Sequence, residues 1–370
     1  MRKSYKLLIF TILTALLTSI AFAGAGRGVS YNTMRNRAMG GVGIISAKGA
    51  TAFIINPALL NRGRVSVSPI SLQFFLNNSF FDLGEFISDN ADSLEFIREL
   101  SPSTLDTIYQ DLNKIDNRWM KLGIPASSAI TVRNIGIAAY WDLDMELKID
   151  KGIYEPRLFA RGKIDKVVTL GFGKGIDFVM PGLKAGAAVK FITRQEAKGL
   201  KLGFSDIEGG DDAATDLLDS LSSGESGFGI DIGGLYSLND KIELGVVIAD
   251  IIGSIDDDDD GSIDDDDDVS PNLKFGASYK LLNRVSAEIN FLDLLNTDET
   301  NFFKRVHIGG EVDLPFLKIR GGFFQGYPSF GVGINLIIIQ ADFAVWTEEI
   351  GPIPGLDGET FYGAQINLGF

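Results

Sequence analysis

Ten aspartates lie within residues 256–268, and they are the side chains of this chain best suited to binding an ion. Calcium prefers carboxylate oxygens at alternate positions of a loop, a glycine at the sharp turn and one backbone carbonyl. The stretch Asp-x-Asp-x-Asp-Gly-Ser-Ile-Asp-x-x-Asp meets this spacing. The candidate calcium ligands are therefore Asp256, Asp258, Asp260, Ser262 through its carbonyl, Asp264 and Asp267.

The same stretch, taken as the acidic loop 254–270, has a second interpretation. So many adjacent aspartates match the calcium spacing easily by chance, and runs of like charge are typical of solvated loops. Asp267 is also shorter than the glutamate usual at the last position of a calcium loop, and no flanking helices are predicted, which argues against an EF-hand. A calcium loop and a solvated acidic loop therefore both stand as hypotheses.

The chain offers little for catalysis. His307 is the only histidine, there is no cysteine, and no G-x-S-x-G motif is present. On a strand whose polar face also carries Arg305, Glu311 and Asp313, His307 is more simply a polar wall residue than a general base. We expect no enzyme activity and, apart from the candidate calcium ion, no cofactor.

The N-terminus carries the pattern of a secretory signal peptide. The basic residues Arg2, Lys3 and Lys6 precede an apolar run of 14 residues, 7–20, and a small-x-small cleavage site ends at Ala23. The run is too short to span a bilayer easily, and no later segment offers 18 uninterrupted apolar residues. We expect residues 1–23 to be a signal peptide and the protein to be exported.

The charge of the chain is concentrated in one place. The formal net charge is −15, and it becomes −18 once the three basic residues of the signal peptide are removed. The ten aspartates of the acidic loop supply most of this excess, so the rest of the chain carries only −8. A nucleic-acid partner would need a basic surface, and we expect none.

The last strand alternates between an apolar face and a small or polar face. Gly363, Gln365, Asn367 and Gly369 share one face, and the apolar residues share the other. In a transmembrane β-barrel such a strand closes onto the first, meets lipid with its apolar face and ends on an interfacial aromatic. The residues that we expect the barrel assembly machinery to use are Tyr362, Ile366, Leu368 and Phe370.

Similar alternation recurs over residues 64–370 and predicts about fourteen strands. A soluble β-sandwich also alternates, but it would need a water-facing side and no export pattern. We therefore predict an all-β fold, a transmembrane antiparallel β-barrel of about 14 strands in the outer membrane. Tight turns are expected at Asn134, Asn239-Asp240, Leu282-Asn283 and Leu314-Pro315, and long connections, all at the other end, at 76–125, 195–226, 254–270, 295–303 and 348–359.

One long connection is predicted to be helical. Residues 82–122 place apolar side chains three and four positions apart, and Pro102 after Ser101 marks a break between two helices. Because this insertion follows the first strand, we expect it outside the membrane, on the extracellular side, near the barrel mouth. Its apolar stripe should pack on the barrel rim, or else on a bound ligand.

The segment between the cleavage site and the first strand, residues 24–63, resembles a known family. The motifs are Arg37-Ala38-Met39-Gly40-Gly41-Val42-Gly43 and Asn56-Pro57-Ala58-Leu59-Leu60, and residues 320–336 and the last strand add to the likeness. They are similar to the N-terminal plug of FadL-type outer-membrane transporters of long-chain fatty acids, and to the related PorV-type and TraF-like barrels. The helical insertion and the aspartate runs depart from the fatty-acid transporter pattern.

A plug also has a physical reason, because a barrel of this width is not filled by its own side chains. Glycines let the segment lie close to the inner wall, and Pro57 fixes the turn toward the first strand. The resemblance implies that apolar substrate enters from outside and leaves by plug movement or sideways through the wall. The expected gating residues are Gly40, Gly41, Gly43, Asn56, Pro57 and Ala58; the alternative is that they only hold a static seal.

The resemblance thus implies an outer-membrane barrel that transports hydrophobic small molecules such as fatty acids, with an apolar lumenal pocket reached from the helical cap. The alternative is a PorV-like, non-catalytic barrel that scaffolds secretion or surface attachment of partner proteins, with a sealed lumen and partner-binding outer loops. A purely structural membrane protein would show neither feature. The expected partners are outer-membrane lipid and either a hydrophobic small molecule or a secreted protein.

Overall fold

The structure is a computed structural model of the whole chain, and it describes most of the predicted barrel and plug. The expected signal peptide and the calcium candidates from Asp258 to Asp267 lie outside the described residues. The described residues are 31–62, 65–95, 102–152, 157–203, 224–256, 271–296, 300–350 and 353–370.

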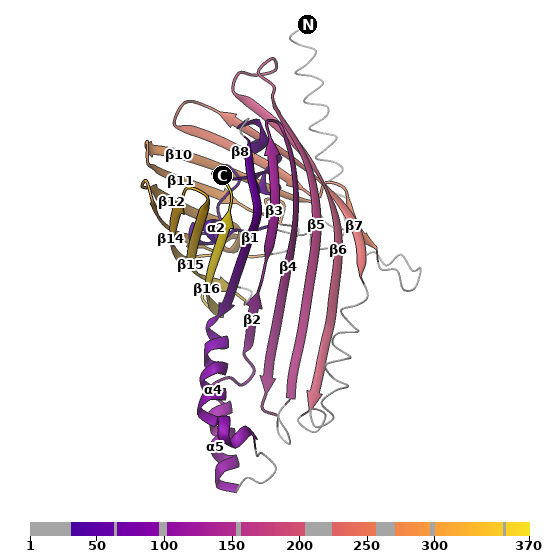
Figure 1. Cartoon of the computed structure of the whole chain (residues 1–370), viewed down its shortest axis with the longest axis vertical. Helices are drawn as coiled ribbons and strands as arrows, with labels where there is room; N and C mark the ends of the chain where they lie inside the picture. The colour runs from indigo at the N-terminus through magenta and orange to yellow at the C-terminus, as the bar shows by residue number, and fades with distance from the viewer. Residues whose placement is uncertain are drawn as a thin grey trace.

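Sixteen strands form one closed antiparallel barrel (Figure 1). Two pairs of strands are consecutive pieces of one barrel position, since β2 and β3 both pair with β1 and β4, and β8 and β9 both pair with β7. The barrel therefore has fourteen strand positions, and β16 closes it by pairing with β1, which confirms the predicted strand number and terminal closure. The strands are β1 (Ser66–Asn77), β2 (Trp119–Gly123), β3 (Ala126–Val132), β4 (Ile135–Asp150), β5 (Arg157–Gly175), β6 (Leu183–Gly203), β7 (Glu225–Ser237), β8 (Ile242–Ala249), β9 (Gly253–Asp256), β10 (Asn272–Leu282), β11 (Val285–Phe291), β12 (Val306–Asp313), β13 (Leu317–Phe324), β14 (Tyr327–Leu336), β15 (Ile339–Glu349) and β16 (Gly358–Leu368).

The period-two pattern of the sequence sorts side chains between the two faces of the wall. On β4, Ile137 and Trp141 are 46% and 48% exposed on the outside, while Ala138 and Tyr140 between them are 2% exposed. Apolar side chains are exposed in the same way on most other strands. Such an outer wall is what lipid covers, and it leaves the opposite face to line the lumen.

The connections differ in length between the two ends. One end has short turns, among them Arg133-Asn134 and Ile337-Ile338, and the other has most of the long connections. Two details correct the sequence-based prediction. The connection expected over 195–226 is shorter, because β6 continues to Gly203, and the long-loop end also contains the tight turn Gln325-Gly326, where both residues have positive φ, as in a two-residue hairpin loop.

The wall is much taller on one side. β5 and β6 contain 19 and 21 residues, whereas β11 and β12 contain 7 and 8. A strand that crosses a bilayer needs about 9–11 residues. The side formed by β4, β5 and β6 therefore projects beyond the bilayer at the long-loop end (Figure 1).

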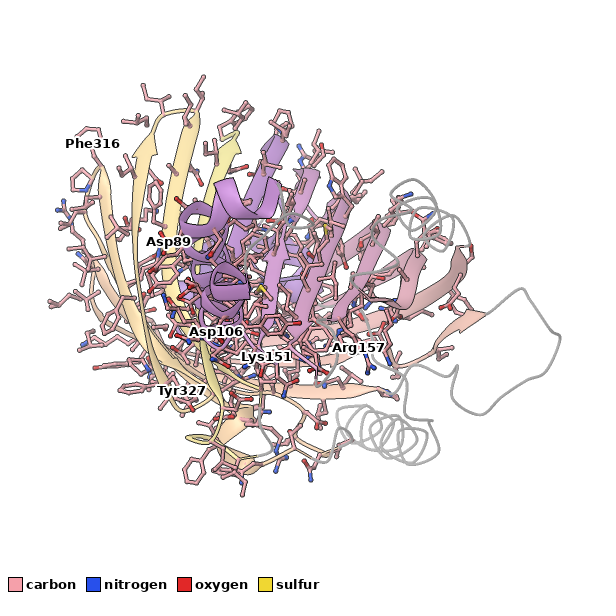
Figure 2. The ribbon with its side chains drawn as sticks, turned by 90° about the horizontal axis from the view of Figure 1, so that it is seen from below. Asp89, Asp106, Lys151, Arg157, Phe316 and Tyr327 are labelled. Atoms are coloured by element: carbon pink, nitrogen blue, oxygen red, sulfur yellow. The ribbon has the colours of Figure 1, made fainter. Side chains whose placement is uncertain are left out.

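A helical hairpin stands at the same end (Figures 1 and 2). It consists of α4 (Asn78–Glu95) and α5 (Pro102–Leu112), and Pro102 opens the second helix as predicted. Phe86, Ile108, Leu112 and Ile115 form its own small core, and Ile149 at the end of β4 packs against it, so the apolar stripe meets the rim.

The predicted helical range of 82–122 needs correction at both ends. Helix α4 already begins at Asn78, and residues 119–123 form strand β2. These five residues pair with β4, where Trp119 lies opposite Lys148 and Gly123 opposite Asp144. Five residues are too few to establish a helical spacing of apolar residues. Backbone pairing with the neighbouring strand therefore decides their conformation. Among all the described residues, no helix is both long and apolar enough to cross a bilayer.

The barrel topology makes a prediction about accessibility. We expect a protease site inserted between residues 204 and 223, or between 257 and 270, to be cleaved on intact cells, because these connections join strands at the long-loop end. A site at Asn239-Asp240 lies in a short turn at the opposite end and should be protected. Proteolysis of intact and permeabilised cells measures this, and equal cleavage of both sites on intact cells would refute the orientation.

Candidate functional site: the plugged lumen

Residues 31–62 fold inside the barrel and form the plug (Figure 1). The plug contains α2 (Met34–Ala38), α3 (Ala52–Ile55) and the 3-10 helix η2 (Pro57–Arg62). Helix α2 begins at the cap Thr33, whose side chain accepts a hydrogen bond from the backbone N–H of Asn36 at 3.2 Å. These elements are short because glycine turns and Pro57 interrupt them, so their stability comes from contacts with the wall.

The turn after α2 depends on glycine. Gly40 and Gly41 have φ of +68° and +83°, which disfavours other residues. A Cβ on Gly40 would lie 2.4 Å from the Ile308 carbonyl oxygen, so the plug backbone touches the wall backbone. His307 is the partner here: its buried Nδ1 lies 2.7 Å from the Gly40 carbonyl oxygen and donates to it. The lone histidine is therefore an anchor of the plug.

The Asn56-Pro57-Ala58 turn is embedded in the wall in the same way. Asn56 is fully buried; its Nδ2 donates to the Ile44 carbonyl at 2.9 Å, and its Oδ1 accepts from the Ala58 N–H at 3.0 Å. The wall offers glycines at this point, and a Cβ on Gly233 would lie 2.0 Å from that Oδ1. Asn56 thus ties two distant parts of the plug together while the turn fits a glycine-lined recess.

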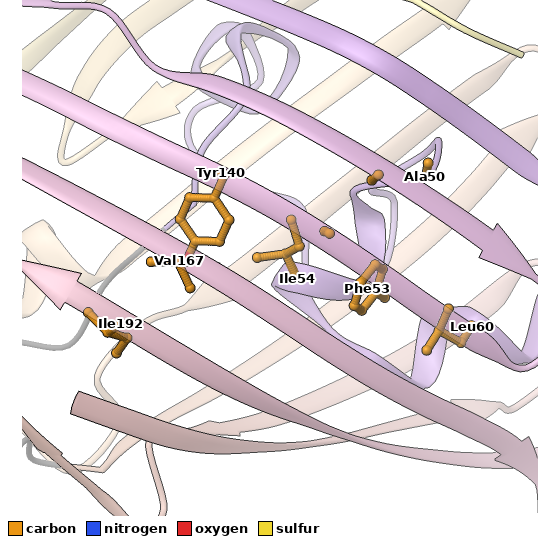
Figure 3. Packing of buried hydrophobic residues seen from close by; sticks show 9 residues of the cluster. Ala50, Phe53, Ile54, Leu60, Tyr140, Val167 and Ile192 are labelled. Carbon is orange, nitrogen blue, oxygen red and sulfur yellow. The ribbon is translucent and has the colours of Figure 1, made fainter. Parts of the chain in front are cut away.

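Apolar packing joins the second half of the plug to the tall side of the barrel (Figure 3). Phe53, Ile54 and Leu60 of the plug cluster with Tyr140 and Val167 of the wall, and all are buried. Tyr31 packs against the Tyr140 ring at a centroid distance of 5.1 Å, and its hydroxyl lies 2.9 Å from Ser127 Oγ. Burial raises the pKa of the Tyr31 phenol, so it stays neutral.

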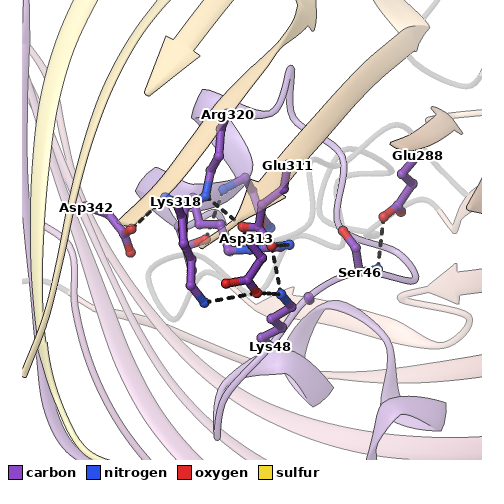
Figure 4. A network of polar contacts seen from close by, with 12 residues as sticks. Ser46, Lys48, Glu288, Glu311, Asp313, Lys318, Arg320 and Asp342 are labelled. Atoms are coloured by element: carbon purple, nitrogen blue, oxygen red, sulfur yellow. Dashed lines mark hydrogen bonds and ion pairs between the residues drawn. The ribbon is translucent and has the colours of Figure 1, made fainter. Parts of the chain in front are cut away.

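A buried ion network fixes the first half of the plug (Figure 4). Its centre is Glu311 on β12, whose side chain is only 1% exposed and which accepts from Arg35 at 3.0 Å, Lys48 at 2.7 Å and Arg320 at 2.8 Å. Arg320 also contacts Asp342 at 2.6 Å. Two plug cations therefore share one carboxylate with a wall cation, in surroundings where an unpaired charge is costly.

The segment from Ile44 to Lys48 is held by apolar packing of Ile44, Ile45 and Ala47 against Leu235 and Val247 of the wall, and by polar contacts. The Glu288 carboxylate accepts from the N–H groups of Ile45 and Ser46 at 3.0 and 2.9 Å. Arg62 donates to the carbonyls of Ile45 and Ala47 at 2.6 and 3.1 Å. Burial lowers the pKa of Arg62 and nearby carboxylates raise it, but an arginine remains charged at neutral pH.

Arg37 binds the plug to the seam where the barrel closes. Its guanidinium carbon lies 4.3 Å from the ring centroid of Phe75 and 4.6 Å from that of Trp346. Phe361 stacks on Trp346 at 5.4 Å. The three aromatics come from β1, β15 and β16, and the cation–π contacts of Arg37 join β1 and β15 on the two sides of the closing strand β16.

The plug separates cavities at the two ends of the lumen. The outer cavity, of about 640 Å³, has plug residues Ile44, Ile54 and Ile55 in its lining. Two inner cavities, of about 610 and 700 Å³, open toward the short turns. Ile45 lines the first of these, so the neighbours Ile44 and Ile45 face opposite ends of the lumen.

The outer cavity corrects one expectation, because its lining is not uniformly apolar. Val247, Ala249, Leu292 and Phe324 contribute apolar surface from the wall. Between them lie polar and charged side chains: Tyr140, Asp144, Lys190, Asp231, Lys274, Asn290, Lys304, Arg305 and His307. A solute in this cavity would meet both kinds of surface.

The structure places the predicted sites as follows. Gly40 and Gly41 form one contact with the wall, Gly43 packs against Asn36 within the plug, and Asn56, Pro57 and Ala58 form a second contact with the wall. Tyr362, Ile366, Leu368 and Phe370 all face outward from the closing strand or its end, and their role in barrel assembly stays a prediction. Asp256 ends β9, and no described group of three or more His, Asp and Glu side chains could hold a metal ion.

Sequence reasoning missed the residues that hold the plug through charge. Glu288, Glu311 and Arg320 belong to lumen-facing positions of alternating strands, which the period-two pattern does identify. Their partners Arg35 and Lys48 are more than 200 positions away in the sequence. No local signal connects the two sets.

Fold and site together define a plugged, fourteen-stranded β-barrel of the outer-membrane type. The chain is similar to the Pseudomonas putida toluene transporter TodX, with a TM-score of 0.52 and 14% identity over 94% of this chain and 98% of that one. It is also similar to a TodX deltaS2S3 mutant described as a monoaromatic hydrocarbon channel, with a TM-score of 0.52, 12% identity and the same coverage. No protein-family model and no curated protein sequence matches the chain. The resemblance to FadL-type barrels is thus confirmed for the fold.

Proposed function

We propose that the barrel lies in the outer membrane and conducts small hydrophobic molecules through its lumen, past the plug. The observation that carries this proposal is the thin partition between the two ends: adjacent residues Ile44 and Ile45 line cavities on opposite sides. The apolar outer wall and the fold shared with a toluene transporter support it.

The contacts of the plug indicate which part would move. The turns at Gly40 and Asn56 press backbone against backbone, and water cannot replace such close packing. The segment 44–48 between them is held by the side chains of Ile44, Ile45 and Ala47, which can repack, and by hydrogen bonds with Glu288, Arg62 and the half-exposed Lys48, which water can replace. We therefore propose that segment 44–48 is the part of the plug that moves. The predicted glycine and Asn-Pro-Ala residues on either side of it stay fixed to the wall.

A scaffold for secretion or surface attachment is the second candidate. The buried network around Glu311 and the Arg37 contact with the closing seam favour a static plug. In that case the barrel would act through its outer end, where the α4–α5 hairpin stands. The two candidates differ in whether segment 44–48 moves.

A reversible cross-link tests the gate. A Cβ on Gly276 would lie 3.4 Å from Ile44 Cβ, close to the roughly 3.5–4.5 Å found in disulfides. Because the chain has no cysteine, Ile44→Cys with Gly276→Cys makes one defined pair. We expect uptake of radiolabelled toluene or oleate by intact cells to fall to background when the pair is oxidised and to recover after reduction.

The oxidised and reduced forms of the double variant carry the same two substitutions, so the reduced form is the control for any effect of the substitutions themselves. Equal uptake above background in both states would contradict a gate at 44–48. Uptake at background with the native barrel would contradict transport altogether. The scaffold would then be supported if a co-expressed surface protein required the barrel to reach the cell surface.

A further inference from the structure

The outer cavity contains neutral hydrogen-bonding groups that have no partner among the residues that the structure describes. Asn290 on β11 is fully buried, and neither its amide nitrogen nor its amide oxygen has a hydrogen-bond partner. Tyr140 on β4 is 2% exposed, and its hydroxyl is equally without a partner. Both line the outer cavity, from nearly opposite sides of the barrel. Leaving such groups unsatisfied costs free energy, which a ligand would recover.

The basic side chains that line this cavity all interact with other protein groups. Lys190 contacts Asp231 at 2.9 Å and Asp250 at 2.6 Å. Arg305 donates to the Asp293 carbonyl at 3.0 Å. A carboxylate ligand could accept a hydrogen bond from Arg305 Nε, which has no partner among the described residues, but it would also meet the acidic side chains of Asp144 and Asp231. Beside the plug, the hydrogen-bonding capacity that is left over is the neutral amide of Asn290.

The plug side of the cavity is apolar. Ile44, Ile54 and Ile55 come from the plug, and Ile44 also lies beside Asn290, since both are close to Gly276 on β10. The amide thus borders an apolar surface that an apolar group can cover. A molecule with a hydrocarbon part and one hydroxyl or carbonyl group would match both surfaces.

We propose that the outer cavity binds uncharged amphipathic small molecules, such as phenols or alcohols, with Asn290 hydrogen-bonded to the polar group and the apolar part resting on Ile44, Ile54 and Ile55. This deepens the proposed function and rests on it for the role of binding in transport, but the binding site itself is independent of whether the plug opens. It distinguishes this lumen from one selective for pure hydrocarbons or for carboxylates.

Four probes with the same methylated ring test the proposal: p-cresol, toluene, p-toluate and 4-methylbenzylamine. Binding is measured by calorimetry on the full-length barrel in lipid nanodiscs, with empty nanodiscs subtracted. We expect the native barrel to bind p-cresol most tightly. Asn290→Leu should weaken p-cresol binding about three- to tenfold, as expected for one lost hydrogen bond, and should not weaken toluene binding.

Gln73→Leu is the matched control, because Gln73 is also a buried amide without a partner but is not among the residues lining this cavity. It should leave p-cresol binding unchanged. Tighter binding of p-toluate or of the amine, or equal affinity of the native barrel for toluene and p-cresol, would overturn the proposal. The comparison of probes on the native barrel needs no variant, so it remains decisive if Asn290→Leu does not fold.

The outcome is separate from that of the transport experiment. Preferential p-cresol binding without uptake by cells would uphold the site and refute conduction. Disulfide-sensitive uptake with no preference for p-cresol would uphold conduction and refute the site.

Discussion

Gly322→Ala should displace the plug and make the barrel leak, whereas Gly321→Ala next to it should have no effect. A Cβ on Gly322 would lie 2.4 Å from the Ile308 carbonyl oxygen and 2.6 Å from the Gly40 backbone nitrogen. These are backbone atoms of the wall and of the plug, so no side chain can turn aside to relieve the overlap. The turn at Met39-Gly40 has to leave its place, and a water-filled path opens beside it.

Gly321 is a close control because it lies on the same strand but faces outward. A Cβ there would be 3.7 Å from the nearest atom, the Ser329 carbonyl oxygen, which is an ordinary contact. Conductance of the purified barrels in planar bilayers measures the difference. We expect a stable open level for Gly322→Ala only, and a native conductance for that variant would show that the plug does not seal through this contact.

Glu311→Gln should detach the first half of the plug and strongly destabilise the barrel. Glu311 is the shared partner of Arg35, Lys48 and Arg320, and its side chain is 1% exposed. The neutral amide leaves the buried Arg35 without a carboxylate partner among the described residues, whereas Arg320 keeps Asp342 and Lys48 keeps Asp313. Breaking a buried pair in this way costs about 3–5 kcal/mol. The free energy of unfolding in guanidinium, for barrels in lipid or detergent, measures the loss.

Asp313→Asn is the matched control, since Asp313 is on the same strand and also contacts Lys48, at 3.0 Å. Its side chain is 39% exposed, and a solvent-exposed ion pair contributes about 0–1 kcal/mol. We therefore expect a small effect from Asp313→Asn. Similar losses for the two variants would mean that the network around Glu311 is not specially buried or coupled to the plug.

The wall of the barrel could be predicted well from local sequence. Each strand repeats an alternation of two residues, and a one-residue shift would turn every apolar side chain from lipid into the lumen. The pattern therefore fixes which face is which, as Ile137 and Tyr140 show on β4. It failed at residues 119–123, where five residues were too few for a reliable period and pairing with β4 decided the conformation.

The candidate site could be predicted only in part. The glycine and Asn-Pro-Ala motifs stood out because they resemble a known plug, and the structure places both against glycines of the wall. The contacts of Glu288, Glu311 and Arg37 could not be anticipated, because plug and wall residues that touch are separated by hundreds of positions. A charged residue at a lumen-facing position can contact either water or a plug, so the sequence pattern alone does not show which of the two it contacts.

The sequence by itself determined the class of fold, the fourteen strand positions and the direction of most wall residues, because these depend on local periodicity. Its resemblance to a known family predicted a small-residue plug. The tertiary structure decided where the plug lies, which carboxylate holds which cation, and that Asn290 and Tyr140 share one cavity. The physical reason is that ion pairs and cavity linings bring together residues that are distant in the sequence. These residues come close to one another only once the barrel has closed.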